Sequence, residues 1–129
     1  MITEDYVSVE IAKLLKEKGF DEECSCFYDN FDYGTPGLEV DGRLYYRNST
    51  LDDEEYAAPT LQMAMKYLRK EHEIFIRPNI SFLYPIRYYC EIFCYGDNLK
   101  TQQDVTTEYF ENPEEACEAA IKYCLENLI

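Results

Sequence analysis

The segment 112–129, "NPEEACEAAIKYCLENLI", restricts the fold more than any other part of the chain, because it fits a capped amphipathic helix. Asn112 can accept a hydrogen bond from the first turn, and Pro113 suits the first helical position because an amide is not needed there. Glu114 and Glu115 lie favourably against the positive end of the helix dipole. The residues spaced to face a core are Ala116, Ala120, Tyr123, Cys124 and Leu128.

Two earlier segments also have apolar residues at helical spacing. Ser8 is placed to cap a helix that ends at Gly19, with Val7, Ile11, Leu14, Leu15 and Phe20 on its apolar side. The second helix follows the acidic connector 51–56, with Pro59 expected in its first turn. Its apolar stripe comprises Leu61, Ala64, Met65 and Leu68, widened by Met63 and Tyr67.

The segments between these helices alternate as strands do. Residues 24–29 and 42–48 predict the two strands of a hairpin, with a tight turn at Asp41-Gly42. The intervening loop Asn30–Gly42 is long for a hairpin, so it holds either an extra short strand or a functional loop. Three more strands are expected at 74–82, 87–96 and 104–110, and Pro78 indicates an edge strand or a bulge.

Together these patterns predict a single α+β domain over residues 1–129. Its order is α-β-β-α-β-β-β-α, an antiparallel sheet with helices packed on it. The second half has the α-β-β-β-α order of double-stranded RNA-binding domains. Such domains need a basic start to the last helix, whereas Glu114 and Glu115 would repel phosphates.

The charge balance excludes several classes of partner. The chain has 26 acidic and 12 basic residues, a formal charge of −14. This charge disfavours direct nucleic-acid binding and anionic membranes, and favours encounter with basic partners. The acidic N-terminal residues do not resemble a signal peptide, and no apolar run approaches the roughly 20 residues of a membrane span. We therefore expect a cytoplasmic protein.

No catalytic or metal-binding pattern stands out. The six Cys residues lie inside regular elements among apolar neighbours, which favours reduced, buried thiols over a zinc site; whether any of them is reactive is left open. His72, the only imidazole, stands at a helix end without a nucleophile nearby, and there is no Gly-rich phosphate loop. We expect no enzyme activity, no cofactor and no metal.

Two surfaces are candidate binding sites. The first is the basic side of the second helix, formed by Lys66, Arg69 and Lys70. This side either pairs with acidic groups of its own chain, or is simply solvated, or contacts an anion. The second is the outer face of the sheet, expected to carry aromatic and polar side chains if Ile74, Ile76, Ile80 and Phe82 point inward. This face either is covered by the first helix and hairpin, or stacks a flat ligand, or forms a subunit interface. Its candidate residues are Arg77, Asn79, Tyr89, Phe93 and Tyr95.

Three stretches resemble small uncharacterised proteins of gut bacteria (Bacteroidales) and their phages. They are "VSVEIAKLLKEKGFDEEC", "YAAPTLQMAMKYLRKEH" and "EEACEAAIKYCLENLI", a little under half of the chain. The resemblance implies a phage or mobile-element setting, in which small acidic proteins often bind host components. It implies no activity and no site residues.

These expectations lead to one main hypothesis and one alternative. The main hypothesis is a non-enzymatic, acidic binding protein that engages or inhibits a host protein with a basic surface, with a counter-defence role in view. The alternative is a small-molecule binder that sequesters a nucleotide-like anionic ligand. Self-association into a homo-oligomer through the aromatic sheet face or an edge strand is compatible with both.

Overall fold

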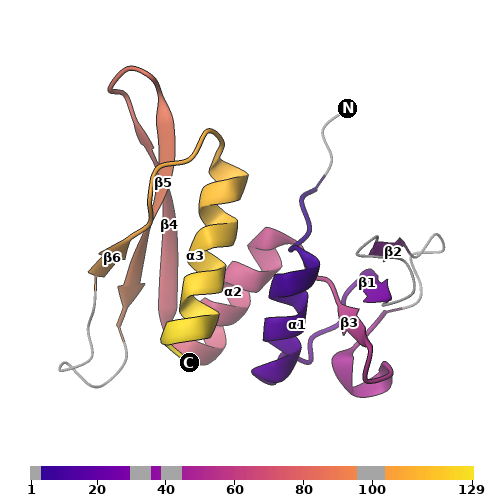
Figure 1. The fold of residues 1–129 in the computed structure, drawn as a ribbon. Coiled ribbons are helices and arrows are strands. Elements are labelled where there is room, and N and C mark those ends of the chain that lie inside the picture. Colours follow the sequence, from indigo (N-terminus) through magenta and orange to yellow (C-terminus); the bar gives the residue numbers. More distant parts are fainter. Residues whose placement is uncertain (1–3, 30–35, 39–44, 96–103) are drawn as a thin grey trace. The chain divides into compact units, whose positions relative to one another are not determined.

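The computed structural model describes residues 4–29, 36–38, 45–95 and 104–129, which belong to two compact units, Met1–Thr60 and Leu61–Ile129 (Figure 1). The α+β class and the predicted order of helices and strands are confirmed, with one short additional strand in the acidic connector. The strands form two three-stranded antiparallel sheets, one in each unit, instead of one sheet. Whether the two units form one domain stays a prediction.

In the first unit, helix α1 (Val9–Glu17) forms as its caps predict. The Ser8 hydroxyl accepts a hydrogen bond from the Ile11 amide at 3.3 Å, which satisfies one of the free donors of the first turn. The helix ends at Lys18, and Gly19 then adopts a φ of 91°, a left-handed conformation that glycine adopts without steric cost. Ile11, Ala12 and Leu15 are the buried residues of α1.

The first sheet corrects the predicted hairpin. Its central strand β1 (Cys26–Asp29) pairs with β2 (Pro36–Leu38) and with β3 (Glu55–Ala57), both antiparallel. Residues 42–48 were expected to pair with β1, but the described part of that segment makes only an isolated bridge between Cys24 and Tyr46. The expected turn at Asp41-Gly42 lies outside the described residues.

A buried amide explains why the chain leaves the sheet after Tyr46. Asn48 begins the short 3-10 helix η2 (Asn48–Thr50) and is the one buried polar residue among those described. Its side-chain nitrogen donates to the Phe20 carbonyl at 2.7 Å, and its side-chain oxygen accepts from the Ala57 amide at 2.9 Å. Asn48 therefore connects β3 to Phe20, which lies just after the end of α1, and turn formation at this point competes with strand pairing.

The second unit consists of α2 (Leu61–His72), β4 (Ile74–Ser81), β5 (Arg87–Cys94), β6 (Asp104–Thr106) and α3 (Pro113–Asn127). The sheet order is β4-β5-β6; α3 packs on β4 and β5, while α2 packs on β4 and α3 (Figure 1). Pro59 was expected in the first turn of α2, but the helix begins at Leu61. Pro59 is instead fully buried before it, and its carbonyl accepts from the Val7 amide at 3.0 Å.

Pro78 lies in an edge strand, as predicted, and the hydrogen-bond pattern shows why it is tolerated. Opposite it, the Cys90 amide donates to the Thr107 hydroxyl and the Cys90 carbonyl accepts from the Thr107 amide, so both groups of Cys90 point toward β6. Position 78 is therefore a non-hydrogen-bonded site, where the amide that proline lacks would point to the free edge of β4.

The C-terminal helix is capped as expected, because the Asn112 side chain accepts from the Glu115 amide at 2.8 Å. Its core-facing stripe is displaced from the predicted one. Ala116, Ala120 and Cys124 are buried as predicted, but Tyr123 and Leu128 are partly exposed. The buried residues missed from the sequence are Cys117, Ile121 and Leu125.

Candidate binding surface of the second sheet

The outer face of the second sheet carries the side chains predicted for it. Strand pairing places Phe75 opposite Phe93, Arg77 opposite Glu91, and Asn79 opposite Tyr89. Cys90 and Ile92, one residue out of phase, are fully buried on the helix side. The alternation therefore confirms that Arg77, Asn79, Tyr89 and Phe93 lie on the face of the sheet that points away from the helices.

Arg77 on this face is already paired. Its guanidinium donates to Glu91 Oε1 at 2.6 Å, and the Asn79 amide donates to the same oxygen at 2.8 Å. Both hydrogen bonds lower the pKa of Glu91, and the bond between Arg77 and Glu91 raises the pKa of Arg77. The guanidinium also lies 5.4 Å from the centre of the Phe93 ring. Arg77, Asn79 and Phe93 thus form one structural cluster with Glu91, and the Arg77 charge is largely compensated within it.

Aromatic rings continue this surface toward β6. Tyr89 and Tyr109 contact edge to face, with ring centres 5.4 Å apart, and Tyr109 is 64% exposed. Tyr95, at the other end of β5, donates its hydroxyl hydrogen to the Arg69 carbonyl at 3.2 Å and so fastens the strand end to α2. Tyr109 was not identified from the sequence as a surface residue, because its strand was expected to continue through residue 110.

The connection between β4 and β5 is the most exposed apolar segment among the residues that the structure describes. It lies at the end of the sheet beyond the start of α3 (Figure 1). The exposed fractions are 79% for Phe82, 81% for Leu83, 98% for Tyr84 and 50% for Ile86; the Tyr84-Pro85 bond is cis. We call these four residues the hairpin tip. The expectation that Phe82 points inward is wrong, because β4 ends at Ser81 and the strand alternation ends with it.

The basic residues of α2 lie on a different part of the unit. Lys66 and Arg69 line a pocket of about 240 Å³ together with Gln62, Met65, Phe75 and Ile76. Lys70 is exposed but does not line this pocket. Within the described part of Leu61–Ile129, none of these three basic side chains forms an ion pair. The eight residues proposed from the sequence therefore do not form one site. Four lie on the outer sheet face (Arg77, Asn79, Tyr89 and Phe93), and two line this pocket (Lys66 and Arg69). Lys70 lies outside the pocket, and Tyr95 bonds to the Arg69 carbonyl.

The cysteines are packed among apolar side chains. Five of the six are buried, and Cys94 is partly exposed. Burial raises the pKa of Cys24 and of Cys124 to about 12, which keeps these thiols protonated at neutral pH. Cys90 donates to the Cys117 sulfur at 3.9 Å; this contact and burial raise the pKa of Cys90. Among the described residues, no group of three or more His, Cys, Asp or Glu side chains could hold a metal ion.

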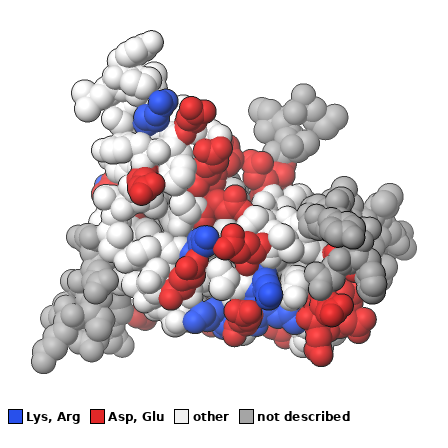
Figure 2. Space-filling view, in the orientation of Figure 1, with Lys and Arg blue, Asp and Glu red and all other residues white. Residues whose placement is uncertain are grey.

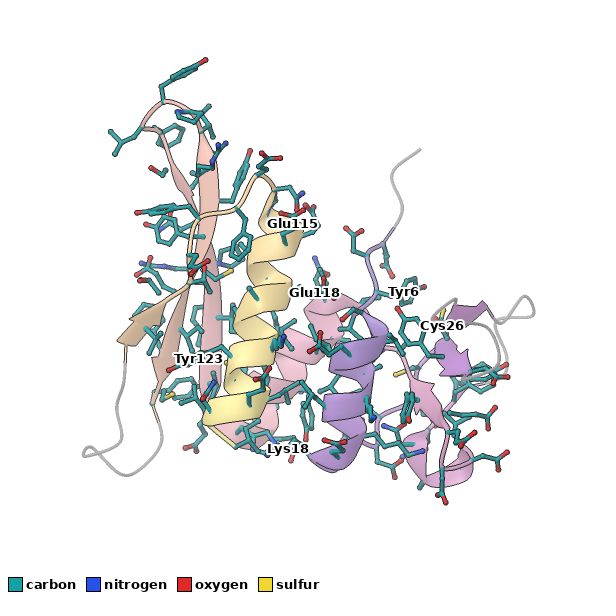
Figure 3. All side chains as sticks on the ribbon, viewed as in Figure 1. Tyr6, Lys18, Cys26, Glu115, Glu118 and Tyr123 are labelled. Atoms are coloured by element: carbon teal, nitrogen blue, oxygen red, sulfur yellow. The ribbon has the colours of Figure 1, made fainter. Side chains whose placement is uncertain are left out.

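Acidic side chains gather over α3 and the preceding turn. Glu111, Glu114 and Glu115 are exposed there, and Figure 2 shows this concentration, with Glu115 and Glu118 labelled in Figure 3. The hairpin tip contains no charged residue, since Arg87 follows Ile86 at the start of β5.

No helix among the described residues is long and apolar enough to cross a membrane. Comparison with protein-family models, with curated proteins and with solved structures finds no match for this chain.

Proposed function

We propose that the protein is a non-enzymatic binding module whose partner is a protein with a basic surface. The hairpin tip supports this proposal most strongly. Exposed apolar groups of this size are unusual on a monomeric surface, and their burial by a partner would stabilise a complex. Aromatic residues such as Phe82 and Tyr84 are enriched among the few side chains that supply most of the affinity of protein interfaces.

The charge supports the second half of the proposal. A formal charge of −14 attracts basic partners over several ångströms and raises the association rate at low ionic strength. The exposed carboxylates of Glu111, Glu114 and Glu115 lie at the start of α3, at the same end of the sheet as the tip (Figure 1), and are available as a polar rim. The resemblance to phage and gut-bacterial proteins favours a host protein in the cytoplasm as the partner, and with it a counter-defence role.

The test combines capture with a matched pair of variants. The full chain, immobilised at low salt, is expected to capture a host protein that the double variant Leu83→Ser and Tyr84→Ser fails to retain. The control is Tyr45→Ser, which removes another exposed tyrosine, 58% accessible, from the first unit. Equal capture by all three proteins would refute the role of the tip. Capture that does not weaken between low and high salt would refute the electrostatic contribution.

The alternative, a binder of nucleotide-like anions, is favoured by one observation, the Lys66–Arg69 pocket beside Phe75. Arg77, also a candidate from the sequence, is less suited because Glu91 compensates it. A nucleotide bound there must raise the melting temperature by mass action. We expect such a shift with a nucleoside triphosphate only if this alternative holds, and expect Lys66→Ala to abolish it. The absence of a shift with all common nucleotides would remove the alternative.

A further inference from the structure

The outer edge of β6, which pairs with no other strand in the described part of the chain, borders an apolar groove on the helix side of the second sheet. Its volume is about 250 Å³, and it lies between β6, the segment that follows β6, and α3. Figure 3 shows Tyr123 on the side of α3 toward the strands, whereas Glu118 lies on the opposite side. The residues that line the groove are Ile92, Val105, Thr106, Thr107, Glu108, Phe110, Ala119 and Tyr123.

The backbone of β6 presents unpaired hydrogen-bonding groups beside this groove. The Thr107 amide bonds to the Cys90 carbonyl, so residues 107 and 90 form a hydrogen-bonded pair. Antiparallel ladders alternate, so Val105 opposite Ile92 is the next such pair, and the N–H and C=O of Thr106 point away from β5. No other strand among the described residues pairs with this edge.

The side chains next to the edge are incompletely covered. Val105 and Thr107 project to the same face as the buried Ile92, yet both are only partly buried, as are Ala119 and Tyr123 on α3. One more strand along β6 would cover these side chains and pair with the Thr106 backbone. A free strand edge flanked by a helix, with an apolar groove between them, is the arrangement by which proteins bind extended peptides through strand addition.

We infer that this groove binds an extended peptide segment of a protein partner, in which small aliphatic side chains alternate with Lys or Arg. The aliphatic side chains enter the groove, because a volume of about 250 Å³ admits residues of the size of valine. Glu108 is the one charged residue in the lining, and the chain carries a charge of −14, so basic flanking residues fit and acidic ones do not. The site goes beyond the proposed function, since it lies away from the hairpin tip.

Titration of the ¹⁵N-labelled full chain with the peptide Lys-Val-Lys-Val-Lys tests the site. We expect saturable chemical-shift changes at the amides from Val105 to Phe110 and at Ala119 and Tyr123. The peptide Glu-Val-Glu-Val-Glu is expected to give no such changes. An absence of saturable change with the basic peptide, changes confined to the hairpin tip, or equal binding of the acidic peptide would each overturn the proposal.

Two variants separate strand addition from unspecific attraction. Thr106→Pro removes only an outward-pointing amide, so pairing with β5 is retained while the peptide loses one hydrogen bond. This loss is expected to raise the Kd by about fivefold. Thr106→Val is the matched comparison, because it changes the same side chain but keeps the amide, and it should raise the Kd less than Thr106→Pro does. Equal Kd values for the proline variant and the parent chain would refute strand addition.

A second blocking variant covers the case in which Thr106→Pro does not fold, as judged by amide dispersion. Ala119→Leu fills the groove from α3 and is expected to abolish the shifts, and retained binding would refute the site. The double variant Leu83→Ser and Tyr84→Ser in the hairpin tip should bind the peptide like the parent chain. The test of the groove beside β6 is therefore independent of the test of the hairpin tip, and failure of one proposal can be distinguished from failure of the other. Self-association that Thr106→Pro abolishes, without peptide binding, would identify a second copy of the chain as the occupant and overturn the inference.

Discussion

Replacement of Asn48 by alanine is expected to be among the most destabilising single substitutions outside the apolar core. The Asn48 side chain bonds two backbone groups: it donates to the Phe20 carbonyl at 2.7 Å and accepts from the Ala57 amide at 2.9 Å. Ala57 is fully buried and Phe20 is 1% exposed. In Asn48→Ala both groups lose this hydrogen bond in surroundings that water reaches poorly.

The magnitude follows from the number of buried hydrogen bonds lost. Loss of the partner of a buried polar group costs about 1–3 kcal/mol, so the loss of two such hydrogen bonds predicts a decrease of roughly 2–6 kcal/mol in the free energy of unfolding. Domains of this size have about 5–15 kcal/mol in total, so the substitution would remove a large share of the stability of the first unit.

Urea unfolding followed by circular dichroism and by tyrosine fluorescence measures this loss, since the chain has 13 Tyr and no Trp. The control is Asn127→Ala, which removes an exposed bond from the Asn127 amide to the Tyr123 carbonyl at 3.1 Å and should cost less than about 0.5 kcal/mol. Hydrogen exchange is expected to show the loss of protection in β3 and around Phe20. A loss below about 1 kcal/mol for Asn48→Ala would refute the reasoning, because it would mean that both groups find other partners.

Three further predictions concern other parts of the chain. Arg77→Ala should raise the pKa of Glu91 toward its usual value, as measured by carbon-13 NMR of the carboxyl group; an unchanged pKa would refute the pairing. The ion pair with Arg77 lowers the pKa of Glu91 in the folded protein. Its contribution to stability is therefore fully present above the usual glutamate pKa and is lost as the pH falls through the lowered pKa of Glu91. The parent chain and the variant should thus become equally stable at acidic pH. With a thiol reagent at neutral pH, Cys94 should react before the buried cysteines, and rapid modification of all six in the native protein would contradict the burial described. Asn112→Ala should cost about 1 kcal/mol in thermal or urea unfolding through loss of the α3 cap, whereas Asn112→Ser should cost much less; equal effects would exclude a capping role.

The helices were the most predictable part of the fold, because their signals are local. Ser8 and Asn112 cap the helices that they were expected to cap, and Gly19 follows the end of α1. Strand alternation also assigned Arg77, Asn79, Tyr89 and Phe93 to one face of the sheet, because a side-chain period of two requires only a correct starting point.

The errors arose where contacts distant in the sequence decide the structure. The pairing of β1 with β3 depends on Asn48, which sequence patterning does not distinguish from any other polar turn residue. The shift of the core stripe of α3 reflects packing on β4 and β5, which brings Ile121 and Leu125 inward and leaves Tyr123 beside the groove.

The candidate site was predicted only in part. The outer sheet face followed from alternation, but the hairpin tip did not, although the sequence contains a signal for it. "FLYPI", residues 82–86, is an apolar run at a position where a turn between strands is normally polar. The pairing of Arg77 with Glu91 could have been suspected from an Arg and a Glu on neighbouring strands, but it depends on a register that the sequence alone did not fix.

The position of Pro78 has a consequence for how this sheet could polymerise. A cross-β fibre can grow only if every sheet that joins it has unpaired backbone N–H and C=O groups on both of its edges. Here β4 contains Pro78, whose missing amide would point outward, and it packs against α2; among the described residues, no strand pairs with the outer edge of β6. If the β6 edges of two copies of this sheet paired, only the two β4 edges would be left exposed. This geometry therefore opposes fibre formation and limits edge-to-edge assembly to two copies.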